Sequence, residues 1–251
     1  MCDLTLTRAA CCVADPSECQ AIEARISNAG FFREFESVVK KRDSAEYTTA
    51  RRPENENKNR FRTCCRTRQR VRVTAPPETN PTGYINASHI SVTMGSQQRF
   101  YIAAQGPLPT TVLHFWQAVW ENNVHLVVML TDATLHRLGR PTACPEDAAG
   151  FVQFVDELAT LRQTAASEMA VAHGGSRNTP VLVHCSAGVG RTGVTVMCDV
   201  LLHCLDHNLE VDVPKLLHHL RQQRMLMVQT MTQYKFIYQV LVHYLKRSRL
   251  I

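Results

Sequence analysis

Residues 181–194 read VLVHCSAGVGRTGV, and the interpretation of the whole chain starts from this stretch. It begins with a short apolar run, Val181 to Val183, which predicts a buried strand. A loop of small residues follows, and the apolar residues after Gly193 predict a helix. Backbone N–H groups in such a loop and the positive end of the helix dipole point toward the same space. The stretch therefore predicts an anion-binding cradle between a strand and a helix.

Two side chains add chemistry to this cradle. Cys185 lies where the predicted strand meets the loop, so the loop N–H groups and Arg191 would stabilise its thiolate. The planar guanidinium of Arg191 suits two oxygens of a phosphoryl group. Together they indicate a cysteine nucleophile directed at a bound phosphate monoester. The alternative is a buried cysteine in a turn.

Length and composition limit the class of protein. The chain has 251 residues, 45% of them hydrophobic, which predicts one large domain. The net charge is +6, and its positive excess lies in residues 51–72, which suits an anionic partner such as a phosphopeptide. Neither aromatic interleaving nor zinc-finger spacing supports binding of nucleic acid. No apolar run is long enough to span a membrane. The N-terminus lacks the basic start and the apolar core of a secretory signal.

The ten cysteines do not form a recognisable metal site. Cys11-Cys12 and Cys64-Cys65 are adjacent pairs, and neither CxxC nor a Cys/His ligand spacing occurs. We therefore expect no metal and no cofactor. A reactive Cys185 also requires a reducing compartment, which favours a cytoplasmic protein.

The order His184-Cys185, five residues, Arg191-Thr192 resembles the phosphate-binding signature of the cysteine-based protein tyrosine phosphatases. The resemblance covers residues 31–251, apart from two irregular stretches. The sequence most resembles the catalytic domain of the FERM-domain-containing non-receptor enzymes. The segments that carry this resemblance are NPTGYINASHI at 80–90, CPED at 144–147 and SRLI at 248–251.

The resemblance implies an α/β cysteine phosphatase fold, with a twisted mixed central sheet flanked by helices. Residues 1–30 would be an N-terminal extension and residues 31–251 the phosphatase domain. Association with the cytoskeleton is implied by the resemblance alone, and no FERM region is present.

The same resemblance implies roles in the cradle. Cys185 would attack phosphorus, Thr192 would stabilise the thiolate on its release, and His184 would help to set the loop. The groups that would hold the phosphate are Arg191 and the loop residues Ser186, Ala187, Gly188, Val189 and Gly190.

Four residues outside the cradle are assigned by resemblance as well. Phe61 would wall the phosphotyrosine pocket, and Glu121 would pair with Arg191. Gln229, or else Gln233, would orient the hydrolytic water. The alternatives are a core position for Phe61 and ordinary solvated positions for the other three side chains.

Two departures from the family bear on activity. Thr63 to Thr67 read TCCRT where the family has a segment whose aspartate grips the substrate backbone. A shifted reading frame over codons for Asp-Val-Leu-Pro-Tyr would produce these residues, a hypothesis that resequencing of the transcript tests.

The second departure is a shortening around residues 132–144. The family's Trp-Pro-Asp loop, whose aspartate protonates the leaving oxygen, is absent, and so are several strands. Asp132, Glu146 and Asp147 are the nearest carboxylates, but nothing in their spacing supports them as substitutes.

The predicted activity is therefore hydrolysis of phosphotyrosine on proteins through a cysteinyl-phosphate intermediate, reduced by loss of the acid. The alternative is a pseudophosphatase that binds phosphotyrosine without turnover. A third alternative is that the chain is a defective gene product that does not fold stably, because the loss of strands exposes the edges of the sheet.

Periodicity predicts the remaining elements. Helices are expected over 17–29, from 110 or 111 to 121, over 194–205 and 214–221, and from 234, and strands over 70–73, 84–90 and 101–108. The run Val124–Leu130 predicts a central buried strand. The stretch from Leu158 to Thr179 is expected to be a polar helix end followed by a loop.

Overall fold

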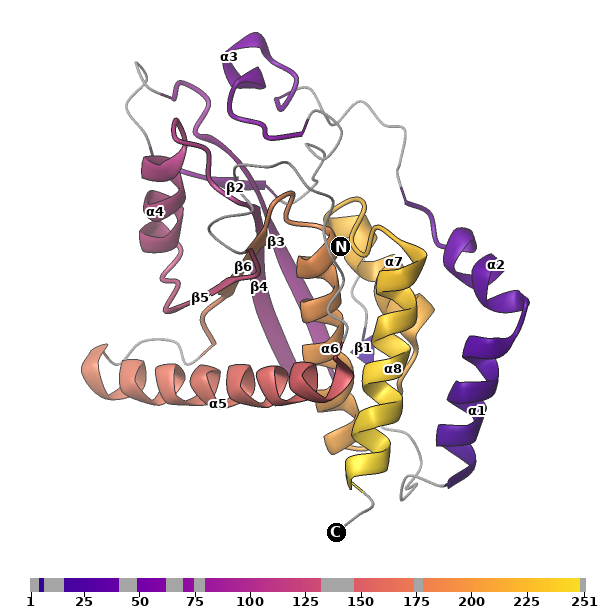
Figure 1. Ribbon diagram of the computed structural model, residues 1–251. Helices are drawn as coiled ribbons and strands as arrows, with labels where there is room; N and C mark the ends of the chain where they lie inside the picture. Colours follow the sequence, from indigo (N-terminus) through magenta and orange to yellow (C-terminus); the bar gives the residue numbers. More distant parts are fainter. Residues whose placement is uncertain are drawn as a thin grey trace.

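The computed structural model of the chain describes residues 5–6, 16–40, 49–61, 70–74, 80–131, 147–173 and 178–248. A mixed sheet forms its centre, with strands in the order β1-β3-β4-β6-β5 and β2 paired to β3 (Figure 1). The strands are β1 (Thr5–Leu6), β2 (Arg70–Arg72), β3 (Tyr84–Met94), β4 (Gln97–Gln105), β5 (Leu126–Met129) and β6 (Val181–Cys185).

The three strands that carry the site run parallel. β6 lies between β4 and β5, and the register pairs Val181 with Tyr101 and Cys185 with Gln105. β3 and β4 form an antiparallel hairpin through a tight turn at Gly95, whose φ is +57°. Every residue of β6 is buried, as a strand covered on both faces requires.

Helices cover both faces of this sheet. α4 (Val112–Glu121) lies on one face, and α5 (Ala148–His173), α6 (Gly190–Asp206), α7 (Val213–Gln223) and α8 (Met231–Ser248) lie on the other (Figure 1). The larger core cluster joins β3, β4 and β6 to α5–α8, and a smaller one joins the opposite face to Phe115 and Ala118 of α4. This arrangement confirms the predicted α/β class with a mixed sheet flanked by helices.

The first helices pack against the outside of α8. α1 (Pro16–Ser27) and α2 (Gly30–Ser37) bury Phe31 and Phe35 against Tyr234, with ring centroids 5.3 and 4.9 Å apart. Glu34 accepts hydrogen bonds from Tyr234 and Tyr238, both at 2.6 Å. The short helix α3 (Pro53–Glu56) begins at a proline, where the missing N–H costs nothing.

Two predictions about elements were wrong. β5 is an edge strand of the described sheet rather than a central one, since it pairs only with β6, and Met129 is 51% exposed. α5 continues to His173 through residues predicted to form a loop. A polar helix that projects beyond the core keeps its backbone hydrogen bonds without an apolar stripe, so periodicity misses its second half.

Within the described ranges, no helix combines the length and the hydrophobicity that crossing a bilayer requires.

Candidate active site

The site is built where β6 passes into α6. Neighbouring strands hold the end of β6, because the Gly106 N–H donates to the Cys185 carbonyl at 2.6 Å and the Leu130 N–H donates to the His184 carbonyl at 2.9 Å. The chain then turns through residues 186–189 and enters α6 at Gly190. The expected strand, loop and helix therefore occur in the predicted order, with Cys185 at the carboxyl end of a parallel strand.

The thiol of Cys185 is fully buried and receives two hydrogen bonds. The backbone N–H of Gly188 lies 3.2 Å from Sγ, and the hydroxyl of Thr192 lies 3.3 Å from it. Both donors favour a negative sulfur, and Thr192 stands in the first turn of α6, where the helix dipole acts in the same direction. The geometry suits a thiolate at this atom.

The backbone N–H groups of the loop, rather than the side chains of Ala187 and Val189, are its donors toward a ligand. The side chains of Ala187 and Val189 pack in the larger core cluster. Gly188 has a φ of +70°, and a Cβ there would lie 2.1 Å from the Ala104 carbonyl oxygen. This position therefore requires glycine, because any side chain would collide with the backbone of β4.

The two glutamines lie against the start of α6. A Cβ on Gly190 would lie 2.8 Å from Nε2 of Gln233 and 3.0 Å from Oε1 of Gln229. Gln233 is fully buried, and its Oε1 accepts a hydrogen bond from the Gln229 N–H at 2.9 Å. The fold thus brings together two amides and a cysteine loop that lie about 40 residues apart in the sequence.

Arg224 was not among the predicted site residues, but it supports the loop that follows Cys185. It is 1% exposed, and its guanidinium donates to the carbonyls of Gly188 at 2.7 Å and Ala187 at 3.0 Å. It also donates to Ser88 and Asn86 on β3, at 2.8 and 2.9 Å. One buried side chain therefore ties the loop to the sheet. A signal was present in the sequence, since Arg224 stands directly before the apolar run Met225–Val228.

The expected pair between Arg191 and Glu121 does not form. Glu121 is exposed at the end of α4, and its carboxylate accepts from the N–H of Thr74, at 3.0 Å to each oxygen. Arg191 instead donates through Nη1 to the carbonyl of Leu130, while its buried Nε has no hydrogen-bond partner among the described residues. The assignment of Glu121 to Arg191 is corrected here, because a helix-end glutamate satisfies the nearest free backbone donor.

His184 packs against α4, and Phe61 follows a segment that is held near the end of β6. His184 is buried and faces α4, where its ring packs edge-on against Phe115 at 5.3 Å. Phe61 is 40% exposed and directly follows Arg60, whose N–H donates to the Gln105 side chain at 3.1 Å. Because Gln105 pairs with Cys185 in the sheet, the chain before Phe61 is anchored beside the site.

Of the three carboxylates named as replacement acids, Asp147 lies in the part of the chain that the structure describes. Asp147 caps the start of α5, accepting from the N–H groups of Ala149 at 3.0 Å and Gly150 at 2.9 Å. Those bonds give Asp147 a structural role as the cap of α5. Asp132, Glu146 and the irregular stretch Thr63–Thr67 lie outside the described residues.

Comparison with known proteins agrees with this geometry. The family model described as "Protein-tyrosine phosphatase" matches residues 55–138 and 140–243. The chain is 34% identical to mouse "Tyrosine-protein phosphatase non-receptor type 14" over 292 aligned positions, covering 92% of the chain and 24% of that protein. It is 35% identical to rat non-receptor type 21, covering 93% and 25%, and 32% identical to mouse type 13, covering 76% and 10%. The chain thus spans about a quarter of the length of the first two relatives.

Proposed function

The chain belongs to the protein-tyrosine phosphatase family, and we propose that it hydrolyses phosphotyrosine on proteins slowly, with Cys185 as the nucleophile. The observation that carries the proposal is the pair of hydrogen bonds to the Cys185 sulfur, from the Gly188 N–H and the Thr192 hydroxyl. A thiolate held at the carboxyl end of a strand, directly before a helix N-terminus, suits attack on a bound phosphate.

The proposed reaction has two steps. The Cys185 thiolate attacks phosphorus, an S–P bond forms, the P–O bond to the tyrosyl oxygen breaks, and the phenolate takes up a proton from the solvent. Water then attacks phosphorus, the S–P bond breaks, and inorganic phosphate and the thiolate are released. Arg191 and the loop N–H groups hold the phosphoryl oxygens in both steps. Gln229 and Gln233, whose amides lie against Gly190 at the start of α6, would orient the attacking water in this proposal.

Protonation of the leaving group limits the first step in this proposal. General acid catalysis typically contributes about 10²–10⁴-fold, and a tyrosyl group with a pKa of about 10 depends on it strongly. The alignment with the mouse type 14 enzyme supports a shortened domain. It has 292 positions, yet 92% of 251 residues is only about 231, so about 60 positions have no residue from this chain.

The second candidate function is binding of phosphotyrosine without turnover. The buried Nε of Arg191 supports the binding step that both candidates share, because this donor has no hydrogen-bond partner in the described structure and a phosphoryl oxygen would satisfy it. Binding relies on the cradle, whereas turnover relies also on an acid. Both candidates take phosphotyrosine-containing proteins as partners, and both fit a cytoplasmic location, where the thiol stays reduced.

One assay separates the two candidates. Purified protein is tested on a phosphotyrosine peptide and on para-nitrophenyl phosphate, beside the Cys185→Ser variant. We expect turnover of the nitrophenyl ester, weaker turnover of the peptide, and none with Cys185→Ser. Peptide binding without turnover of either substrate would leave the binding function alone. Absence of both, in a protein that unfolds cooperatively, contradicts both.

A further inference from the structure

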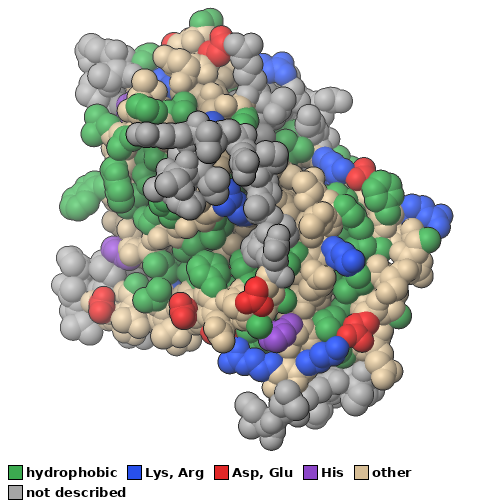
Figure 2. Space-filling view, in the orientation of Figure 1, with side chains coloured by type: hydrophobic (Ala, Val, Ile, Leu, Met, Phe, Trp, Pro, Cys, Tyr) green, Lys and Arg blue, Asp and Glu red, His purple; other side chains and the backbone are tan. Residues whose placement is uncertain are grey.

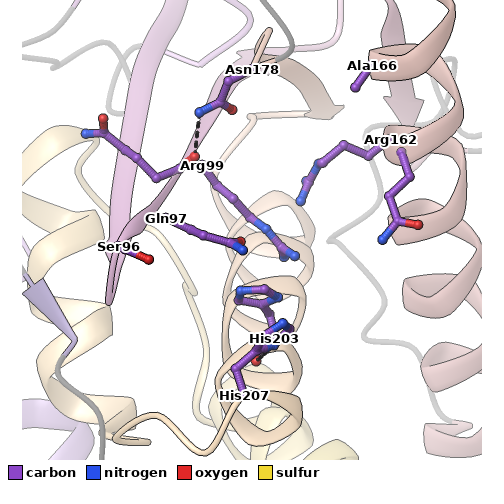
Figure 3. A pocket seen from close by; sticks show the side chains of 10 residues that line it. Ser96, Gln97, Arg99, Arg162, Ala166, Asn178, His203 and His207 are labelled. Carbon is purple, nitrogen blue, oxygen red and sulfur yellow. Dashed lines mark hydrogen bonds between the residues drawn. The ribbon is translucent and has the colours of Figure 1, made fainter.

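A pocket of about 450 Å³ lies far from the cradle, between the start of β4, the second half of α5 and the end of α6 (Figure 3). It lies toward the opposite end of the sheet, because Gln97–Arg99 lie at the amino end of β4 and Cys185 at the carboxyl end of β6. The four residue-to-residue steps from the Tyr101–Val181 pair to the Gln105–Cys185 pair alone span about 13 Å. The pocket has the size of a small-ligand site.

The charges on the pocket wall are all basic. Arg99, Arg162, His203 and His207 line it, and none of the ten lining residues carries a carboxylate. Asn178 and Gln163 are among the remaining residues, most of which carry an amide or a hydroxyl. Figure 3 shows the guanidinium groups of Arg99 and Arg162 directed toward each other, above the two histidine rings. A wall with these donors suits an anion.

One buried carboxylate holds the two arginines in place but does not satisfy them. Asp199, which is 2% exposed, accepts from Nη1 of Arg99 at 2.9 Å and from Nη2 of Arg162 at 2.6 Å. It also accepts from the hydroxyl of Tyr101. Among the residues that the structure describes, two guanidinium charges therefore face a single carboxylate, and one positive charge remains uncompensated at the pocket.

An unused donor points to the same conclusion. Nη1 of Arg162 is buried and has no hydrogen-bond partner in the described structure. A buried donor left unpaired costs about 1–3 kcal/mol, and more when it is charged, so a ligand oxygen at this point would be stabilising. The guanidinium is fixed by Asp199 and by packing at 5.2 Å over the ring of Tyr101, so it is already ordered for binding.

The histidines of the pocket, His203 and His207, would also sense a bound anion. Their rings stack with centroids 3.9 Å apart. Burial, together with the positive charges of Arg99 and His207, lowers the pKa of His203 to about 4, so its ring is neutral at pH 7. A bound anion would offset those charges and favour the protonated ring, which gives binding a spectroscopic signature.

We propose that this pocket is a second anion site, which binds the phosphate group of a small molecule through Arg99, Arg162 and the His203–His207 pair. The phosphate group could be free inorganic phosphate or part of a larger phosphorylated metabolite. The site does not depend on the activity of Cys185, because it shares no residue with the cradle.

The test is a histidine NMR titration with inorganic phosphate and, separately, with glucose 6-phosphate. It uses an Arg191→Met background, which weakens anion binding at the cradle. We expect the ring signals of His203 and His207 to shift and saturate. Tighter binding of glucose 6-phosphate would identify a metabolite site, and equal affinity would identify a phosphate site. Unshifted rings with both probes would overturn the proposal.

A second test adds a negative charge to the pocket lining without removing a side chain that the fold needs. Ala166 is a half-buried residue of α5 that lines the pocket without any polar role, so Ala166→Glu adds a carboxylate and removes no hydrogen bond. We expect roughly tenfold weaker binding for Ala166→Glu and near-normal binding for the neutral Ala166→Gln. Equal affinities in the two variants would contradict an anion site here.

Discussion

Arg224 shows how one buried side chain can position the proposed active site from outside it. Its guanidinium donates four hydrogen bonds, to two loop carbonyls and two polar side chains of β3, which is a geometry that only a planar guanidinium matches. A charge buried to this degree is tolerated because each neighbour is a hydrogen-bond acceptor. Its task is to fix the loop that carries the N–H groups around Cys185.

We predict that Arg224→Met destabilises the protein by about 3 kcal/mol or more, because it leaves several buried acceptors unpaired. Arg224→Lys should recover only part of this loss. Denaturant unfolding measures the stability, and turnover of para-nitrophenyl phosphate measures the effect on the loop. Arg247→Met, at an exposed arginine paired to Asp156, is the matched control and should be nearly neutral. A variant with normal kcat/KM in its folded fraction would contradict the positioning role.

His203 makes the stability of the fold depend on pH. The unfolded chain takes up a proton at this ring near pH 6.5, whereas the folded chain does so near pH 4. Between these values the unfolded state binds more protons, so the free energy of unfolding falls as the pH falls. We predict a smaller pH slope over this window for His203→Gln, measured by urea unfolding. A His203 ring that titrates near pH 6.5 in the folded protein would contradict the account.

Among the helices and strands, the sequence positions of the strand and helix around Cys185 were predicted better than the order of the strands in the sheet. The apolar run before His184 and the small residues after Cys185 predict a strand and a helix start, and both occur. The same kind of apolar run at Val124–Leu130 does not reveal that β5 lies at an edge, because a run records burial along a strand and not which strands flank it. Arg224 was missed because a charged residue before an apolar run also fits a surface position.

α4 has one buried and one exposed apolar side. Phe115 is 4% exposed and Ala118 is fully buried, whereas Trp116 is 57% and Trp120 is 84% exposed. Figure 2 shows hydrophobic side chains gathered on the side of the molecule where α4 lies. Helical spacing predicted an apolar stripe but could not tell which of its members reach the sheet.

This difference gives a prediction for α4. Phe115→Ala should cost about 3–5 kcal/mol, because it opens a cavity beside His184. Trp120→Gln should change the stability by no more than about 0.5 kcal/mol, because its ring is already in water. Thermal or urea unfolding compares the two variants. A comparable loss for Trp120→Gln would mean that its ring is covered in solution.

At the scale of the whole molecule, the fold carries two basic sites at opposite ends of one sheet. The cradle lies at the carboxyl end of β6 and the second pocket near the amino end of β4, and α6 runs from the first to the second. The cradle could be predicted because its residues are contiguous in the sequence. The pocket could not, because Arg99, Arg162 and His203 come from three elements that only the tertiary fold brings together.

The central claim is that Cys185 acts as a nucleophile without a dedicated acid for the leaving group. Its most direct test is the rate of turnover across a series of aryl phosphates whose leaving phenols differ in pKa, with Cys185→Ser as the blank. We predict a steep decline, of about 10²-fold or more, from acidic nitrophenols to phenol. Equal rates across the series would show that a dedicated acid operates, and turnover by Cys185→Ser would show that Cys185 is not the nucleophile.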